Sequence, residues 1–321
     1  MLSFAVKRVL WTIPVLLVCI TILFALMQAV RSSPLRRGPP LGLSNVGWVK
    51  YSDWQPEAIR RNQERKLGID KPWYVQYERY VRSVARFDFG PTFMFRYRTV
   101  NSILREQGPL TLQLMLLALG IAFALGIPLG VLAAVRSGTI VDHAVTALVA
   151  ATMGLPLFFV ATVLIYLLGV KWGLVPTFGW DGWRAKMVPS FVLALMPLSM
   201  ITRVIRAEML EVLGAGHVQV ARAKGLRHSR ILRVHVLRSA LIPVLSMTGL
   251  LIGSLVTGLF VVEYIFAIPG IGRYFIAAAG AGDYPLTLGL TVVLTMAIVV
   301  TNMLSDIAHA AIDPRIREAT R

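Results

Sequence analysis

Three residues near the carboxyl end of the chain have the types and the spacing of a metal site. Asp306, His309 and Asp313 stand at i, i+3 and i+7, so a helix would place them on one face. Carboxylate oxygens and imidazole nitrogens are common ligands of divalent metals. The three residues lie at the end of the last apolar segment, however, where charged side chains usually contact water. We therefore interpret them as a solvated helix end and predict no metal site.

Other catalytic motifs are missing from the sequence. A membrane enzyme needs polar groups that meet at membrane depth, such as paired aspartates or an H-E-x-x-H zinc helix, and neither pattern occurs. No G-x-x-x-x-G-K-[ST] loop is present for binding ATP, and ionisable residues do not line the apolar segments as an ion-coupled transporter would require. Cys19 is the one cysteine, which excludes an internal disulfide and a thiolate metal cluster. We predict no catalytic residue and no cofactor in this chain.

The composition is that of an integral membrane protein. Of the 321 residues, 56% are hydrophobic and only 15% are charged, and about 20 apolar residues are enough for a helix to cross a bilayer. The first apolar run follows Lys7 and Arg8 as in a secretory signal, but it is longer than a typical signal core, so we interpret it as an anchor. The sequence predicts an all-α fold with about six membrane spans, at residues 9–30, 109–135, 144–170, 187–209, 239–262 and 284–308.

The distribution of basic residues predicts the orientation. Lys7 and Arg8 precede the first span and three arginines lie in residues 313–321, so the positive-inside rule places both termini in the cytoplasm. Residues 31–108 are also basic, but so long a segment can be translocated regardless of charge. We predict that they form an extracytoplasmic insertion, amphipathic between Trp73 and Phe89. The formal charge of +17 is thus explained without a nucleic acid partner.

Prolines and glycines inside the spans indicate kinked, closely packed helices. Helix breaks in lipid need protein or water nearby to satisfy the freed carbonyl groups, and two G-x-x-x-G spacings, Gly126 with Gly130 and Gly249 with Gly253, permit close helix contact. The sequence offers a translocation path only as a weak prediction, near Pro128, Pro156, Pro197 and Met247. Three tryptophans between the third and fourth spans are expected to anchor the membrane interface: Trp172, Trp180 and Trp183.

The segment between the fourth and fifth spans is too long and too charged to be a simple turn. It spans residues 208–238 and reads EMLEVLGAGHVQVARAKGLRHSRILRVHVLR. Ala221 to Lys224 favours a short helix, Gly225 can end it in a left-handed conformation, and Ser229 can begin a second helix. Such a unit is suited to dock into a partner protein; the alternative is a basic loop that binds anionic lipid headgroups.

This segment resembles the cytoplasmic loop of ABC importer permeases, whose pattern is E-A-A-x3-G-x9-I-x-L-P. Gln219 and Ala221 stand at the first and third positions and Gly225 at the glycine, while His235 and Arg238 depart from the isoleucine and the proline. The string ARAKGL, followed by basic residues, is similar to the peptide-importer branch. Other strings, in the same order as in the B-type oligopeptide and dipeptide permeases, extend the resemblance over nearly the whole chain: KRVLWTIPVLL, LGIDKPWYVQY, FDFGPTF, VEYIFAIPGIGRYF, DYP and DPRIR. Residues 36–57 match poorly.

The resemblance implies a type I ABC importer permease fold in a bacterial inner membrane. The chain would form half of the pore, paired with a second permease, two P-loop ATPases that bind ATP and Mg²⁺, and an extracytoplasmic peptide-binding protein. Residues 263–272 are expected to form a short outer helix that turns back towards the pore mouth, where Glu263, Pro269 and Gly270 are a weak prediction for an outer gate; a structural cap is the alternative. The implied ATPase-coupling residues are Gln219, Ala221, Arg222, Ala223, Lys224, Gly225 and Leu226.

The sequence thus divides into an anchor helix, an insertion, a five-helix core and a tail, at residues 1–30, 31–108, 109–312 and 313–321. Three alternatives stay open at this point. The same branch includes permeases for dipeptides, nickel chelates, haem and other small solutes. A stand-alone channel or lipid-bound scaffold would leave the Gly225 bend without a role, and an intramembrane hydrolase would need a polar constellation that the sequence lacks.

Overall fold

The structure, a computed structural model, describes residues 2–32, 71–92, 95, 98–281 and 283–312. These residues are almost entirely helical, and the β pairing among them is one isolated bridge between Pro91 and Thr99. The predicted all-α class is therefore confirmed for the described part of the chain. The predicted tail, residues 313–321, and most of the predicted insertion lie outside it.

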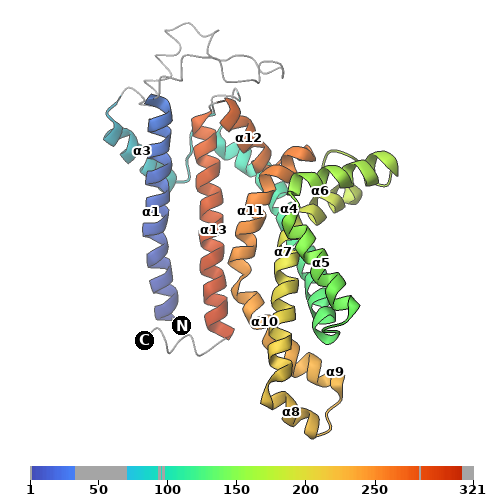
Figure 1. Cartoon of the computed structure of the whole chain (residues 1–321). Helices are drawn as coiled ribbons and strands as arrows, with labels where there is room; N and C mark the ends of the chain where they lie inside the picture. Colours follow the sequence, from blue (N-terminus) through green and yellow to red (C-terminus); the bar gives the residue numbers. More distant parts are fainter. Residues whose placement is uncertain (1, 33–70, 93–94, 96–97, 282, 313–321) are drawn as a thin grey trace.

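The longest helices run along the length of the molecule (Figure 1): α1 (Leu2–Ser32), α4 (Val100–Val135), α7 (Gly182–Gly214) and α13 (Tyr284–Ile312). A capping box begins α4, in which the hydroxyl of Thr99 accepts from the backbone N–H of Ser102 and the hydroxyl of Ser102 accepts from that of Thr99. This helix starts nine residues before the predicted span, so the end of the predicted insertion belongs to it.

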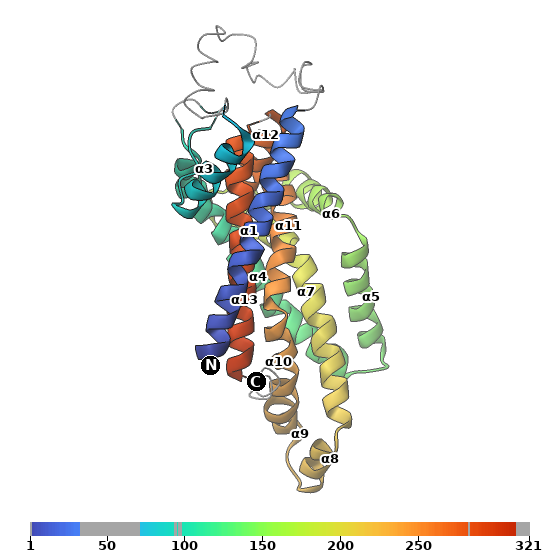
Figure 2. The ribbon, with the colours of Figure 1, turned by 90° about the vertical axis from the view of Figure 1, so that its left-hand side faces the viewer.

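The predicted third span, residues 144–170, is wrong as a single helix. The chain instead forms α5 (Ile140–Gly154), followed by α6 (Leu157–Leu164) and the π-helical segment η2 (Ile165–Lys171), and the two halves are bent by 106°. Pro156 supplies the reason, because a proline disfavours helical geometry in the residue before it, and Leu155 is accordingly extended with a ψ of 133°. The proline that the sequence predicts to kink this span therefore produces a sharp bend between α5 and α6 (Figure 2).

The described part of the chain has four or five candidate membrane spans, whereas the sequence predicts six. Four helices are long and apolar enough to cross a bilayer, within Val100–Val135, Gly182–Gly214, Thr248–Ile265 and Pro285–Ile307, and the bent pair would be a fifth. In α1 the described apolar stretch, Leu10–Leu26, is shorter than those four. The count of six stays a prediction. The predicted fifth span is divided at Met247 into α10 (Leu237–Ser246) and α11 (Thr248–Ile265).

The core centres on α7, which packs closely against α4. A Cβ built on Gly130 would lie 2.7 Å from the Cβ of Ile205, and one on Gly126 would lie 3.0 Å from the carbonyl oxygen of Leu198. The predicted contact role of this glycine pair is confirmed. In the second pair Gly249 meets Asn302 of α13, whereas nothing lies within 4 Å of a Cβ on Gly253. Only one glycine of the second pair therefore makes a close contact.

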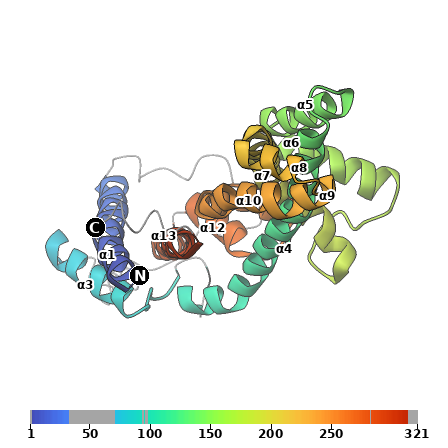
Figure 3. The same ribbon diagram turned by 90° about the horizontal axis from the view of Figure 1, so that it is seen from below.

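The amphipathic stretch after the insertion forms α3 (Trp73–Ala85), which packs against α1 through Tyr77 and Tyr80 on the ring of Phe24. Seen from below, α1 lies beyond α13, away from α7 (Figure 3). Of the three predicted interfacial tryptophans, Trp172 and Trp183 are exposed. Trp180 is buried, and its Nε1–H donates to Gln113, so the prediction is wrong for that residue.

Candidate functional site

The segment between α7 and α10 forms two short helical pieces joined by a glycine bend. They are α8 (Gly216–Ala223), then α9 (His228–Arg230) continuing into the π-helical η3 (Ile231–Val236). Gly225 has a φ of +76°, and its N–H donates to the carbonyl oxygen of Arg222 over 2.9 Å. The predicted helix, glycine and helix arrangement is confirmed, although α8 begins at Gly216, before the predicted start at Ala221. Figures 1 and 2 show α8 and α9 at the end opposite α3 and α12.

An apolar base fixes this segment to the helices above it. Val218, Ala221 and Ile231 are buried, and they belong to the same core cluster as Met209 of α7 and Ala240 of α10. Side chains in a core of this kind are closely packed, so α8, η3 and the ends of α7 and α10 are held as one unit. The segment and α7 therefore share one packed core.

The outer surface of the segment combines apolar and basic side chains. Val220 is 55% exposed and Val234 49% exposed, with arginines and Lys224 around them. An apolar centre with a polar rim is the usual anatomy of a protein interface. The predicted coupling residues divide into two groups. Ala221 is buried and Leu226 half-buried, so these two support the segment, while the others are exposed: Gln219, Arg222, Ala223, Lys224 and Gly225.

At the other end, residues 266–270 form a turn between α11 and α12, so the prediction of one short helix over residues 263–272 is wrong. Helix α11 ends at Ile265, Ala267 has a φ of +52°, and the N–H of Ile268 donates to the carbonyl oxygen of Glu263 over 2.9 Å. This is a Schellman-type helix end with alanine at the left-handed position. The short outer helix, α12 (Ile271–Ala281), begins only after the turn.

The carboxylate of Glu263 joins this turn to α4. Glu263 is fully buried; its Oε1 accepts from the hydroxyl of Thr111 over 2.7 Å, and its Oε2 accepts from the backbone N–H of Gly272 and Arg273. Thr111 in turn accepts from the N–H of Ile271. The first N–H groups of a helix carry partial positive charge, so the start of α12 is a favourable place for the oxygens of the Glu263 side chain. A side chain on Gly270 would overlap the carboxylate, which explains the glycine there.

Replacing Glu263 by alanine should loosen the outer turn. The change leaves buried N–H groups of Gly272 and Arg273 without an acceptor, at a cost of about 1–3 kcal/mol for each unsatisfied group. We expect faster hydrogen exchange at the amides of residues 271–273, measured by mass spectrometry on the purified chain. Glu263→Gln is the matched control, because its amide oxygen can still accept from the same N–H groups and its NH₂ can donate to Thr111. Equal exchange in both variants would contradict the role of the carboxylate.

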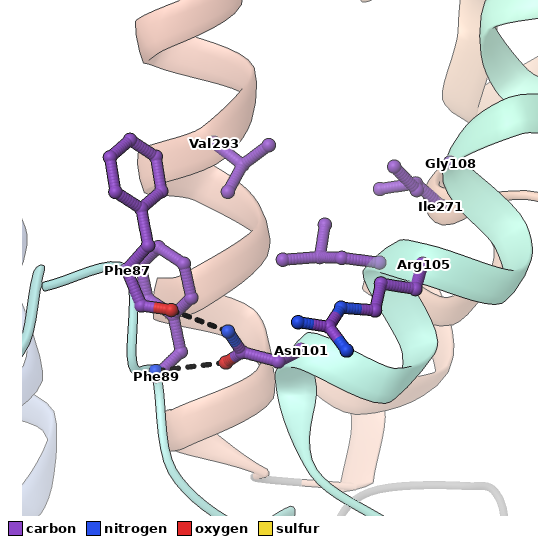
Figure 4. A pocket seen from close by; sticks show the side chains of 8 residues that line it. Phe87, Phe89, Asn101, Arg105, Gly108, Ile271 and Val293 are labelled. Atoms are coloured by element: carbon purple, nitrogen blue, oxygen red, sulfur yellow. Dashed lines mark hydrogen bonds between the residues drawn. The ribbon is translucent and has the colours of Figure 1, made fainter.

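A pocket of about 350 Å³ lies near this turn, between α4, α12 and α13 (Figure 4). The side chain of Asn101 accepts from the N–H of Phe89 over 3.0 Å and donates to the carbonyl oxygen of Phe87, which holds Phe87 at a φ of +53°. Sequence analysis missed this site, although the two phenylalanines belong to the FDFGPTF string. The pocket is lined by Phe87, Phe89, Asn101, Leu104, Arg105, Gly108, Ile271 and Val293.

The predicted path residues differ in exposure and do not line this pocket. Pro128 and Pro156 are exposed, Pro197 is buried and Met247 is half-buried, and none of the four lines the pocket. Of the predicted outer-gate residues, Gly270 is buried beside the side chain of Glu263. Pro269, the residue before Gly270, is half-buried.

The structure describes only part of the three-residue set Asp306, His309 and Asp313 at the end of the last helix. Asp306 is half-buried on α13, whereas the side chain of His309 and all of Asp313 lie outside the described residues. Among the residues that the structure describes, no group of three or more histidine, cysteine, aspartate or glutamate side chains could hold a metal ion.

A partly buried ion pair joins α5 to α7, and no local pattern in the sequence indicates it. Asp142 in the first turn of α5 is 2% exposed, and both of its carboxylate oxygens accept from the guanidinium of Arg206 on α7, over 2.6 and 2.8 Å. The predicted third span began after Asp142, and the predicted fifth span ended before Glu263, but both residues lie within observed helices. Both carboxylates lie near a helix end, so the expectation that ionisable residues do not line the interiors of the spans stays a prediction.

Comparison with known families decides what kind of protein has this geometry. Residues 126–318 match the family described as the binding-protein-dependent transport system inner membrane component. The chain belongs to that family. The dipeptide transport system permease protein DppB of Bacillus subtilis is 34% identical over 99% of this chain and 98% of its own length. The oligopeptide transport system permease protein OppB of Escherichia coli K12 is 34% identical over 99% of this chain and its full length.

Solved structures agree on the fold. A chain of the inward-facing MetNI methionine ABC transporter superposes with a TM-score of 0.55 at 21% identity and covers 66% of this chain and 96% of its own. A chain of an amino acid ABC transporter has a TM-score of 0.50 at 18% identity, covering 67% of this chain and 94% of its own. The predicted permease fold of an ABC importer is thus confirmed.

Proposed function

We propose that this chain is a transmembrane subunit of an ATP-driven peptide importer and forms half of its translocation pore. The proposal is supported by relatives that are named oligopeptide and dipeptide permeases and that match along nearly the whole chain. In this proposal the chain pairs with a second, homologous permease and receives peptides from an extracytoplasmic binding protein. Two P-loop ATPases bind ATP and Mg²⁺ and hydrolyse the nucleotide, so this chain has no catalytic activity of its own.

The observation that carries the proposal is the helical segment held on an apolar base below α7. Its exposed valines and basic side chains would enter a cleft on one ATPase, with Gly225 at the bend. Because the segment, α7 and α10 are packed as one unit, closure of the two ATPases would move the spans between inward-open and outward-open states. A lipid-binding loop would not need so rigid a base.

The proposed orientation follows from this docking role. The segment would lie in the cytoplasm, together with both termini, and the insertion at residues 31–108 would lie outside. The turn around Glu263, Pro269 and Gly270 would then be on the outer side of the inner membrane, as part of an outer gate. Pro128, Pro156, Pro197 and Met247 would contribute to a path that is completed by the second permease.

Uptake by the complete importer in proteoliposomes would test the substrate class. We expect ATP-dependent accumulation of a labelled peptide of three to five residues, with competition by other peptides of similar length. Unlabelled dipeptides, a nickel chelate and haem are the competitors that separate the alternatives. Competition by haem or a nickel chelate but not by peptides would contradict the peptide assignment, while leaving the importer assignment in place.

A further inference from the structure

Helix α5 has few buried side chains. Of its 15 residues only Asp142, Val145 and Val149 are buried, whereas Ile140 is 84% exposed and Leu148 56% exposed. The two valines contact α4 through Ala133 and Leu129. The buried valines of α5 therefore contact α4, and α5 also packs along α7. Two polar contacts join α5 to α7 near the two ends of α5, beside a weaker one from Arg203 to the sulfur of Met153.

The first contact with α7 is the ion pair at the beginning of α5. Arg206 donates from Nε to Oδ1 of Asp142 over 2.6 Å and from an η nitrogen to Oδ2 over 2.8 Å. The N–H of Gly138 also donates to Oδ2, over 3.0 Å, so the pair includes the turn between α4 and α5. Two parallel hydrogen bonds between a guanidinium and a carboxylate fix orientation as well as distance.

The second contact lies near the other end of α5, just before the bend. The hydroxyls of Thr152 and Ser199 lie 2.5 Å apart, and Ser199 is fully buried on α7. Each hydroxyl has a backbone carbonyl of its own helix within reach, that of Val149 for Thr152 and that of Leu195 for Ser199. Since a hydroxyl has one proton, one of the two donates to the other and the second donates to its own helix.

We propose that these two contacts are positioning contacts that make α5 follow α7 during transport. Arg206 lies eight residues before the end of α7 at Gly214, from which the docking segment begins. Movement of that segment would reach α5 through the Asp142–Arg206 pair, and the contact at Thr152 would carry it to the bend that leads into α6. This inference depends on the proposed importer function, because it assigns a route for the coupling that function requires.

The alternative is that the pair only stabilises the fold. Removing one partner of a buried pair leaves an uncompensated group, whereas replacing both partners is often much less harmful. Replacing both Asp142 and Arg206 therefore distinguishes two causes of lost uptake: a charge left without its partner, and a broken connection between α5 and α7. With Asp142→Asn and Arg206→Gln together, both side chains are neutral and can still form a hydrogen bond between α5 and α7.

The test uses the complete importer in proteoliposomes and measures ATP hydrolysis and peptide uptake in parallel. We expect Asp142→Asn and Arg206→Gln to keep ATPase binding and hydrolysis but to lower peptide uptake per ATP by roughly tenfold, within the usual range of coupling between sites. The double variant should recover part of that loss. Asp181→Asn and Arg184→Gln are matched controls, because both residues are exposed on or beside α7 and neither contacts α5, and they should leave uptake per ATP unchanged.

A distance measurement gives a readout that a purely stabilising pair would not change. Spin labels at Leu148→Cys on α5 and Met196→Cys on α7, in a Cys19→Ser background, occupy exposed positions. We expect their separation to be the same with and without trapped nucleotide in the parent, and to change with nucleotide in Asp142→Asn/Thr152→Val.

Either of two results would overturn the inference. One is a separation that changes with nucleotide in the parent, which would mean that α5 does not follow α7. The other is uptake per ATP that is unaffected in the single variants. If the unmodified chain binds no ATPase, the proposed importer function is wrong. That outcome differs from the two results above, which concern only the connection between α5 and α7.

Discussion

Replacing Gly225 by valine should weaken binding of the ATPase by about tenfold. Gly225 has a φ of +76°, where an L-residue costs about 1–2 kcal/mol and a β-branched one is a strong outlier. Nothing lies within 4 Å of a Cβ at this position, so the effect comes from the backbone and not from a steric clash. Because about 1.4 kcal/mol corresponds to a tenfold change in an equilibrium constant, a shifted bend should be measurable in a binding titration with the purified ATPase.

Gly225→Asn is the informative control for this experiment. Asparagine tolerates the left-handed region, so it should preserve the bend and most of the affinity. Gly214→Ala, at the end of α7 in open space, should also be harmless. Equal affinity for the valine and asparagine variants would show that the conformation of Gly225 does not determine docking.

Replacing Gly130 by leucine should disrupt the central helix pair and give the largest loss of stability. A Cβ there would lie 2.7 Å from Ile205 and 2.8 Å from the carbonyl oxygen of Thr202, and backbone cannot move aside as a side-chain tip can. Overpacking a closely packed contact costs about 1–3 kcal/mol, and small residues are what allow helices to approach in membranes. We expect a lower midpoint of thermal unfolding in detergent, measured by tryptophan fluorescence.

The same helix contains its own control. Gly120 of α4 has no atom within 4 Å of a Cβ, so Gly120→Leu adds the same side chain without a clash and should leave the thermal midpoint near that of the parent. A similar decrease for both variants would mean that leucine is harmful anywhere in α4, and would remove the special role of Gly130.

The sequence was most informative where local rules decide the structure. Apolar length predicts the long helices, and the Gly126 and Gly130 spacing predicts a close contact, because each depends on residues near one another in the chain. The bend at Gly225 is predictable for the same reason, since glycine readily adopts positive φ and the flanking residues favour helix.

Other features of the structure depend on contacts between residues far apart in the chain, and the sequence has no local signal for these contacts. Asp142 and Arg206 are 64 residues apart, so their pairing has no local signal, and the same is true of Thr111 and Glu263, at 152. Trp180 looks like the exposed Trp172 in the sequence, but it is buried in the core, where it contacts Gln113 and Lys186. At Pro156 the sequence predicts a break, but the angle of 106° depends on how α6 packs beyond it.

A crosslinking experiment at Val220 tests the docking role of the α8 segment most directly. Val220→Cys in the Cys19→Ser background places one thiol on the exposed face of the segment, and Leu148→Cys places one on α5 as a control. We expect a short bifunctional reagent to join the complex at position 220 to a P-loop ATPase subunit, identified by mass spectrometry, and to give no such product at position 148. Recovery of the Val220→Cys chain without any ATPase adduct, from membranes that transport peptide, would contradict the proposed coupling.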